Sequence, residues 1–196
     1  MHPSKLLIVM ALPQESRGLL ERSRANLLYT GVGKVNAAAT LARRLAEIRC
    51  SGAELPLVVN MGTAGSRGIP AHTLVAATRF AQRDMDVSGL GFAPGVTPFD
   101  AAPAVIEFPH VFTHLRAALC STADSFATDR HEVSGDVVDM EAFALARVCF
   151  ADQARFACVK YVTDGADSDS ATHWEAALDN AARAFHTTYE FLLALE

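Results

Sequence analysis

Residues 5–15 read KLLIVMALPQE, and this stretch sets the pattern on which the fold is built. Five apolar side chains follow one another before the turn at Leu12-Pro13 and the acid Glu15. A continuous run of this kind predicts a strand buried on both faces, because a strand with one face in water alternates apolar and polar residues. Similar runs predict further strands at 27–29, 56–60, 73–77, 115–121, 137–138 and 157–162.

Segments with helical periodicity separate these strands. After Gly33, apolar residues recur at i, i+3 and i+4 with charged residues between them, which predicts a helix of about 15 residues. Helices are also predicted at 14–23, at 140–150 and along a terminal segment from Trp174, whereas 83–108 is rich in Gly, Pro and Asp and is predicted to be a long loop. Strands alternating with helices predict one α/β domain over residues 1–196, with a mainly parallel sheet covered on both faces.

The composition excludes several classes of protein. The 196 residues are 51% hydrophobic and 20% charged, which is enough apolar material for a sizeable core and argues against intrinsic disorder. The net charge is −5 and there is no run of Lys or Arg, so neither nucleic acid nor an anionic membrane surface is an expected partner. No apolar stretch is long enough to span a bilayer, no signal-peptide pattern is present, and the four cysteines show no CxxC spacing. We therefore expect a cytoplasmic protein with reduced thiols.

The glycines in Gly31-Val32-Gly33-Lys34 suggest a phosphate-binding loop, but their spacing does not fit one. A Walker loop requires Gly at position 28 and Ser or Thr at position 35, where this chain has Leu28 and Val35. The dinucleotide fingerprint fails because Asn36 occupies the place of its third small residue. What remains is a tight turn from strand to helix, whose backbone can approach a ligand closely.

Metal-dependent and acyl-transfer chemistry lack the residues that they need. His110 and His114 have helical ligand spacing but no third ligand, and we interpret them as a solvated pair. Asp167 and Asp169 resemble the start of a calcium loop that lacks its glycine. No GxSxG motif is present. We expect no metal and no cofactor.

Acidic side chains stand just after three of the predicted strands. Glu15 follows the first strand, Asp139 and Glu141 flank Met140 at a strand-to-helix junction, and Asp164 closes the last strand. Ligands of open parallel sheets bind beyond the carboxyl ends of the strands, so these acids are expected to share one site. Several carboxylates without a metal suit a cationic transition state, in which one acid protonates a leaving group and the others stabilise positive charge or orient water.

Six short segments extend this interpretation. They are Ala11-Leu12-Pro13-Gln14-Glu15, Thr30-Gly31-Val32-Gly33-Lys34-Val35, Asn60-Met61-Gly62-Thr63-Ala64-Gly65, Asp124-Ser125-Phe126, Val138-Asp139-Met140-Glu141-Ala142 and Thr163-Asp164-Gly165-Ala166-Asp167. In this order they resemble the nucleoside phosphorylase/nucleosidase superfamily, above all the bacterial 5′-methylthioadenosine/S-adenosylhomocysteine nucleosidases, over nearly the whole chain. The resemblance implies a three-layer sandwich with a mainly parallel or mixed central sheet.

The resemblance also implies a mechanism for hydrolysis of a purine nucleoside. Asp164 matches the general acid that protonates N7 of the purine. Glu141 matches the residue that binds the ribose hydroxyls and stabilises the oxocarbenium-like sugar, and Glu15 matches the carboxylate that orients or deprotonates the attacking water.

The remaining matched positions are expected to contact substrate. The resemblance implies that Met140 packs against the ribose, that Phe126 stacks on the base, and that the backbone of Ala127 binds the edge of the base. The water is flanked by Thr63, Ala64 and Gly65, and the 5′ substituent by Leu12, Val32 and Trp174. Leu90 and Phe92 match positions that the family's dimers donate to the partner's pocket, so the resemblance implies a homodimer.

Three alternatives remain open at this stage. The first is a phosphorylase of the same fold; phosphate-binding arginines of such enzymes correspond to Glu15 and Asn60 here, which favours water, although Arg17 lies near. The second is a nucleoside-binding protein without activity, which would not need the three acids. The third is a different 5′ group, because Trp174 is bulkier and Leu90 less aromatic than the family's usual residues; relatives that act on futalosine or adenosyl-lipid intermediates have the same acids.

Overall fold

The computed structural model describes residues 2, 5–125, 135–165 and 170–195, and the side chains of 170–173 are left out of this description. An eight-stranded sheet forms the centre of the described part. Its strands are β1 (Leu6–Met10), β2 (Leu27–Tyr29), β3 (Leu57–Gly65), β4 (Leu74–Gln82), β5 (Val105–Glu107), β6 (Arg116–Thr122), β7 (Val137–Asp139) and β8 (Phe156–Asp164).

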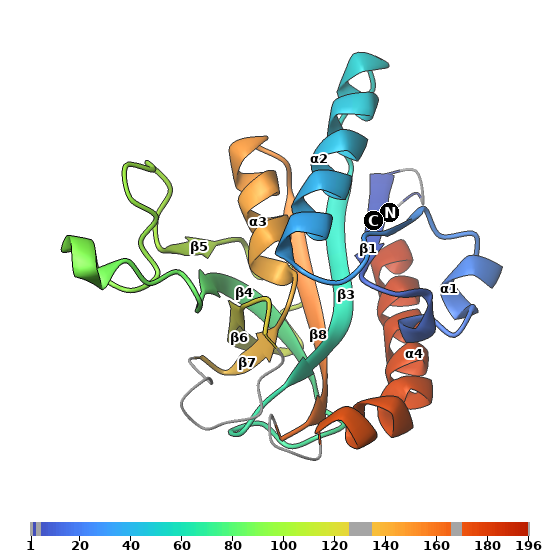
Figure 1. The fold of residues 1–196 in the computed structure, drawn as a ribbon. Coiled ribbons are helices and arrows are strands. Elements are labelled where there is room, and N and C mark those ends of the chain that lie inside the picture. The colour runs from blue at the N-terminus through green and yellow to red at the C-terminus, as the bar shows by residue number, and fades with distance from the viewer. Residues whose placement is uncertain (1, 3–4, 126–134, 166–169, 196) are drawn as a thin grey trace.

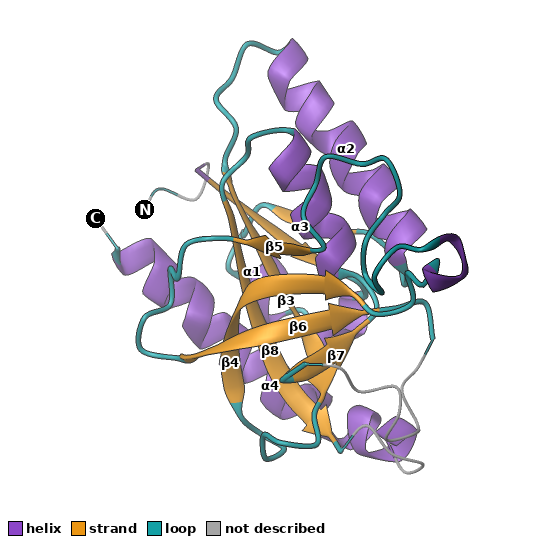
Figure 2. Ribbon diagram, turned by 90° about the vertical axis from the view of Figure 1, so that its left-hand side faces the viewer, coloured by secondary structure: helices purple, strands orange, loops and turns teal. Residues whose placement is uncertain are grey.

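The sheet is mixed, and part of it closes on itself. The strand order is β2-β1-β3-β7-β6-β4-β5, and β8 pairs with both β3 and β4. The pairs β1·β2, β1·β3, β3·β8, β4·β6 and β6·β7 are parallel, and β3·β7, β4·β5 and β4·β8 are antiparallel. Because β8 bridges β3 and β4, the strands β3, β7, β6, β4 and β8 form a ring, and Figure 2 shows the resulting strong curvature.

Helices cover both faces of the sheet, as the α/β prediction requires. Helices α2 (Lys34–Cys50) and α3 (Ala142–Ala151) lie on one face, and α4 (Ser170–Ala194) lies on the other with the short α1 (Leu19–Arg22) beside it (Figures 1 and 2). The first strand shows how its sequence serves both layers. Leu7 and Val9 belong to the core under α2 and α3, whereas Leu6, Ile8 and Met10 belong to the core under α4. The continuous apolar run is confirmed as a strand buried on two faces.

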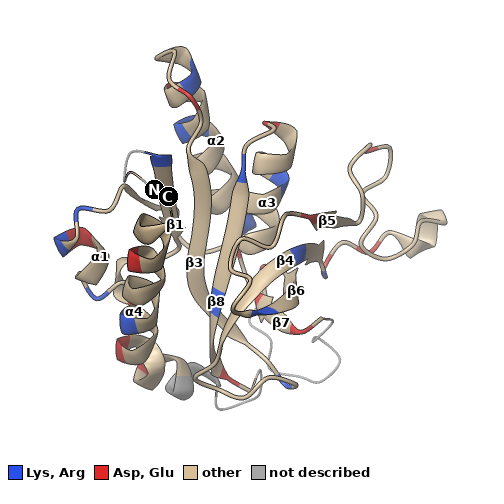
Figure 3. Ribbon diagram, turned by 180° about the vertical axis from the view of Figure 1, so that it is seen from behind, with Lys and Arg blue, Asp and Glu red and all other residues tan. Residues whose placement is uncertain are grey.

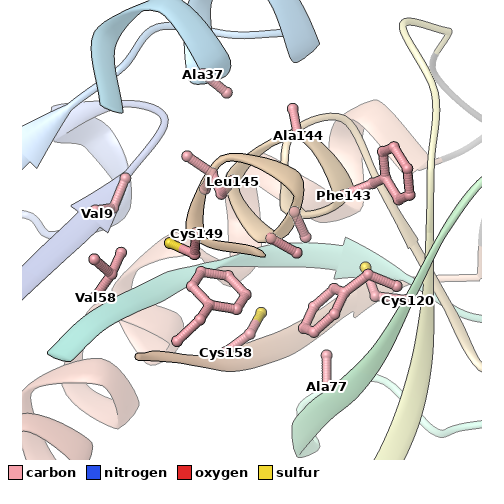
Figure 4. Close-up of a cluster of buried hydrophobic side chains, with 14 of the residues drawn as sticks. Val9, Ala37, Val58, Ala77, Cys120, Phe143, Ala144, Leu145, Cys149 and Cys158 are labelled. Carbon is pink, nitrogen blue, oxygen red and sulfur yellow. The ribbon is translucent and has the colours of Figure 1, made fainter. Parts of the chain in front are cut away.

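Three of the four cysteines lie in the core beside α3. Cys120, Cys149 and Cys158 are buried around the aromatic and aliphatic side chains drawn in Figure 4, while Cys50 is exposed, and all four are free thiols. Burial raises the pKa of the Cys158 thiol to about 12, so this thiol stays protonated near neutral pH. These buried cysteines act as small apolar residues in the packing.

The predicted helix at 14–23 is wrong. Residues Pro13–Glu15 form a single 3-10 turn, and α1 contains only Leu19–Arg22. Between them Arg17 (φ 47°) and Gly18 (φ 73°) are left-handed, which ends any helical path that begins at Pro13. The consequence for the site is that a tight turn carries Glu15.

Strands β3 and β4 extend well beyond their predicted ends. Strand β3 continues through the Met61–Gly65 segment that the sequence marks as a turn, because it pairs with β8 along almost its whole length. Strand β4 extends to Gln82 for the same reason, through its pairing with β6. The predicted loop at 83–108 contains a 3-10 turn at Ser88–Leu90 and ends in β5; residues 83–104, the arm, project away from the sheet (Figure 1).

Charged side chains lie mainly on the helices and loops, and β3 carries none (Figure 3). Among the described residues, no helix combines the length and apolar character that crossing a bilayer requires.

Candidate active site

A cavity of about 270 Å³ lies where β1, β3, β7 and β8 end. We call it the acidic pocket, because four of its lining residues are carboxylic acids. The lining consists of Ala11, Leu12, Glu15, Val32, Thr63, Ala64, Gly65, Arg83, Ser125, Val138, Asp139, Met140, Glu141, Thr163, Asp164 and Trp174. Its volume lies close to the lower end of the range for small-ligand pockets, about 300 Å³. The cavity therefore suits one compact molecule and not a dinucleotide.

Most of the residues predicted from the sequence meet in this pocket. The three acids Glu15, Glu141 and Asp164 all line it. The other predicted residues that line it are Leu12, Val32, Thr63, Ala64, Gly65, Met140 and Trp174. Phe126 and Ala127 lie outside the described residues. Leu90 and Phe92 do not line the pocket of their own chain; both are on the arm, where Phe92 packs edge-on against Phe99 with ring centroids 5.6 Å apart.

Glu15 is held by three hydrogen-bond donors. Its Oε1 accepts hydrogen bonds from the Thr63 backbone N–H at 2.9 Å and from the Thr63 hydroxyl at 3.0 Å. Its Oε2 accepts a hydrogen bond from the Leu12 N–H at 3.2 Å, across the 3-10 turn. The residue as a whole is 4% exposed. A carboxylate has about four acceptor positions, so this one is fixed in place and keeps acceptor capacity for a further donor.

Glu141 is held at the N-terminus of α2 by the glycine turn. The Gly33 N–H donates a hydrogen bond to Glu141 Oε1 at 2.8 Å, and Gly33 has φ 93°, a conformation that favours glycine. The sequence predicted that this turn could approach a ligand; the contact seen here is instead to a carboxylate of the protein itself. Burial, reinforced by the nearby negative charge of Asp139, raises the pKa of Glu141 to about 7.

Asp139 and Lys160 form an ion pair beneath the pocket. Lys160 Nζ lies 2.7 Å from Asp139 Oδ2, and both side chains are 1% exposed. The same Oδ2 accepts the Ala142 N–H at 2.8 Å, so Asp139 also caps α3. Although burial opposes its ionisation, the Lys160 ammonium lowers the pKa of Asp139, and the Asp139 charge in turn raises the pKa of Lys160. Both groups are therefore charged over the whole physiological range.

A change of strand register brings Asp164 into the pocket. Along β3·β8 the pairing shifts between Ala64 and Gly65, so that Gly65 pairs with Asp164 and Thr163 is left over. Neighbouring residues of a regular strand face opposite sides, but at such a bulge this alternation is broken. Thr163 and Asp164 both line the pocket, and the Thr163 hydroxyl donates a hydrogen bond to Asp164 Oδ2 at 2.6 Å.

The chemical capacity of the pocket is that of a cation-stabilising site. Four carboxylic acids face two cations, Arg83 in the lining and Lys160 below it, and Lys160 is already paired with Asp139.

Among the described residues, no group of three His, Cys, Asp or Glu side chains is arranged to hold a metal ion. Of the histidine pair, His114 is exposed as predicted, although its ring contacts Phe191 with centroids 4.5 Å apart, whereas His110 is half-buried and its Nε2 is buried.

The raised pKa of Glu141 predicts opposite trends for stability and activity with pH. In the folded protein the carboxyl binds its proton up to about pH 7, whereas its ordinary value is 4.5, so folding stability falls as the pH rises through this interval. Glu141→Gln removes this penalty and is expected to be more stable than the wild type at pH 8 by on the order of 3 kcal/mol, with little difference at pH 4.5. If ionised Glu141 serves the reaction, wild-type kcat/KM falls below pH 7. Denaturant unfolding and rate profiles between pH 4.5 and 8 measure both; a pH-independent stability difference would contradict the assignment.

Several lining residues and the buried cation were not predicted from the sequence. Arg83 lies outside the six segments that carry the resemblance. Four further lining residues lie within those segments, but no role was predicted for them: Ala11, Ser125, Val138 and Thr163. Lys160 did leave a signal: it stands in the middle of the apolar run FACVKYV, and a lysine in a fully buried strand needs an acid as partner.

Comparison with known sequences gives consistent matches. The model of the Phosphorylase superfamily matches residues 15–195. A 5′-methylthioadenosine/S-adenosylhomocysteine nucleosidase of Geobacillus thermodenitrificans is 31% identical over 197 residues, covering 90% of this chain and 81% of the relative. A protein of the same name from Actinobacillus succinogenes is 29% identical, covering 80% of this chain and 75% of the relative.

Solved structures share the fold. The 5′-methylthioadenosine/S-adenosylhomocysteine nucleosidase of S. pneumoniae, solved with a transition-state inhibitor, superposes with a TM-score of 0.83 at 20% identity, covering 97% of this chain and 99% of that one. A futalosine hydrolase mutant of Helicobacter pylori superposes with a TM-score of 0.81 at 19% identity, covering 94% and 96%.

Proposed function

The chain belongs to the phosphorylase superfamily, and from that membership we infer that its acidic pocket separates a purine from its sugar. The protein is a purine nucleosidase, an N-glycosyl hydrolase that acts on a 5′-modified adenosine of the methylthioadenosine/S-adenosylhomocysteine type. The observation that carries this function is the meeting of Glu15, Glu141 and Asp164, which are far apart in the sequence, in one cavity of a chain with these relatives.

In the proposed reaction, Asp164 donates its proton to N7 of the purine while the C1′–N9 bond breaks and its electron pair leaves with the base. The sugar becomes oxocarbenium-like, and the negative charge of ionised Glu141, which also accepts hydrogen bonds from the ribose hydroxyls, stabilises it. Water then attacks C1′, and Glu15 orients this water and takes up its proton. The products are free purine and a free 5-substituted ribose.

Glu15→Gln tests the proposed water-activating role. The amide keeps the size of the side chain and retains an oxygen for the Thr63 N–H, but it is a poor base. We expect kcat to fall by about a hundredfold while KM changes little, because general-base catalysis typically contributes about 10²–10⁴-fold. Steady-state kinetics of base release measures both constants. Unchanged hydrolysis in this variant would exclude Glu15 as the residue that activates water.

Water is favoured over phosphate as the nucleophile by the charges around Glu15. Arg17, the arginine nearest to it in the sequence, does not line the pocket; its Nε lies 2.9 Å from Asp179 Oδ1 on α4. Asn60 occupies the second position that corresponds to a phosphate-binding arginine of the phosphorylases. Its side-chain amide donates a hydrogen bond to the Val9 carbonyl at 3.1 Å. A carboxylate at this point repels an anionic nucleophile. Base release with and without phosphate tests this directly, since a phosphorylase forms sugar 1-phosphate and depends on phosphate.

We infer that the apolar lining residues determine which 5′ substituent the pocket accepts. Leu12, Val32 and Trp174 supply apolar surface to the pocket, which suits a thioether or another apolar group. Futalosine remains the specific alternative, because a futalosine hydrolase has this fold. A panel of methylthioadenosine, S-adenosylhomocysteine, inosine and futalosine, assayed for release of base, separates these substrates. Release of base from none of them would refute the proposed function.

We propose that the protein acts as a homodimer through the arm. Leu90 is 75% exposed and Phe99 is 98% exposed, and large apolar side chains in such positions mark contact surfaces. Leu90 and Phe92 are then available to complete the pocket of the partner. Sedimentation equilibrium measures the mass in solution, and a monomer at assay concentration with full activity would contradict this proposal.

A further inference from the structure

A hydrogen-bond chain connects Trp174 to Glu15. The indole N–H of Trp174 donates to the Thr63 hydroxyl oxygen at 2.9 Å, and that hydroxyl lies 3.0 Å from Glu15 Oε1. Trp174 belongs to α4, Thr63 to β3 and Glu15 to the 3-10 turn after β1, so the chain joins three separate elements at the edge of the acidic pocket.

The direction of each hydrogen bond in this chain is fixed by chemistry. An indole N–H can only donate, so it occupies an acceptor position of the Thr63 oxygen. An ionised carboxylate can only accept, so the single hydroxyl proton of Thr63 points at Glu15 Oε1. Trp174 thereby restricts the rotation of the Thr63 hydroxyl, so that the hydroxyl proton points only towards Glu15 Oε1.

The donors around Glu15 leave its free acceptor capacity mainly on one oxygen. Oε1 receives two hydrogen bonds, both from Thr63, and Oε2 receives one, from the Leu12 N–H. With two acceptor positions on each oxygen, Oε1 is filled and Oε2 retains one. A water molecule that needs a base therefore meets Oε2.

We propose that Trp174 is a positioning residue for hydrolysis, which acts on Glu15 through the hydroxyl of Thr63 in addition to lining the pocket. This inference rests on the proposed function, in which Glu15 activates water. Loss of the indole N–H frees the Thr63 hydroxyl to rotate, so the Glu15 carboxylate and its water are held less firmly. Binding of the nucleoside itself does not require these hydrogen bonds between Trp174, Thr63 and Glu15.

A double-mutant cycle in the whole 196-residue chain separates this role from simple packing of the pocket wall. Trp174→Phe keeps an aromatic ring and removes the N–H, Thr63→Val removes the hydroxyl at similar size, and Thr63→Ser is the matched control that retains it. We expect Trp174→Phe to lower kcat for methylthioadenosine about three- to tenfold with KM within about twofold, as the loss of one ordinary hydrogen bond would. In the Thr63→Val background, Trp174→Phe should cause no further loss, and Thr63→Ser should recover most of kcat.

The opposite results overturn the proposal. If the losses of Trp174→Phe and Thr63→Val multiply, the two side chains act independently. If the loss appears in KM and differs between methylthioadenosine and S-adenosylhomocysteine, Trp174 is only a wall for the 5′ group.

A measurement without substrate keeps this inference distinct from the proposed function. Trp174 is the only tryptophan of the chain, so the protein gives one indole N–H resonance in a ¹⁵N-correlated NMR spectrum. We expect this proton to exchange slowly with solvent, to exchange faster in Thr63→Val, and to shift in Glu15→Gln, although the indole hydrogen bond is to Thr63 and not to Glu15. An indole resonance that is the same in the wild type and in Thr63→Val overturns the proposal, whether or not the protein releases base. A wild type that releases no base while the resonance responds as expected would refute the proposed function alone.

Discussion

Asp164→Asn is expected to lower kcat for methylthioadenosine by about a thousandfold or more, within the range that a positioned general acid contributes. Asparagine has nearly the same shape, but its amide cannot give up a proton to the purine N7, so the base must leave as an anion. The Thr63–Gly65 end of β3 and the Thr163 hydroxyl bond do not depend on a proton at this position. Folding is therefore expected to be retained, which circular dichroism and thermal unfolding can verify.

Asp179→Asn supplies the matched control for this substitution. Asp179 is also an aspartate and lies on α4, where it pairs with Arg17 at the surface; the exposed fractions of the two side chains are 68% for Asp179 and 42% for Arg17. Surface pairs of this kind contribute about 0–1 kcal/mol, so this variant should keep both its stability and its activity. Near wild-type turnover in Asp164→Asn would remove the acid role and leave Asp164 as a structural residue at the end of β8.

The parts of the fold that follow from local sequence were predicted well. Continuous apolar runs gave β1 and the middle of β8, because burial on two faces leaves that signature in a single segment. The helix predicted at 14–23 failed because the left-handed residues Arg17 and Gly18 interrupt it. The end of β3 was missed because a partner strand, β8, decides how far it extends.

The same distinction applies to the pocket. Acids that follow strands could be located from the sequence, since strand ends gather at one edge of a sheet. The bulge through which both Thr163 and Asp164 line the pocket could not be predicted from the sequence, because it depends on the register between β3 and β8. The Trp174–Thr63 hydrogen bond likewise joins residues 111 positions apart, and no local pattern specifies it.

Lys160→Met is expected to cause the largest loss of stability, about 3–5 kcal/mol, because it leaves the charge of Asp139 buried without its partner. Methionine matches the unbranched lysine stem, so little volume is lost. Gly62 shows how closely this region is packed: a Cβ at that position would lie 3.1 Å from Lys160 Nζ and 3.5 Å from Glu15 Oε1. Denaturant unfolding of Lys160→Met, Asp139→Asn and the double variant gives the coupling between the two side chains, and we expect the double variant to lose less than the sum of the singles.

The pH dependence of Lys160→Met distinguishes an unpaired charge from a simple packing defect. In the wild type Lys160 holds the pKa of Asp139 below its ordinary value of 3.8, so the contribution of the pair is present above that pH and is lost only in stronger acid. Without Lys160, burial dominates and raises the pKa of Asp139, so the folded variant takes up a proton as the pH falls. Its deficit relative to the wild type should therefore be largest near pH 7 and shrink towards pH 4.5, whereas the double variant with Asp139→Asn should show no such trend. A deficit that stays constant across this range would mean that Lys160 contributes through packing and that Asp139 does not depend on its charge.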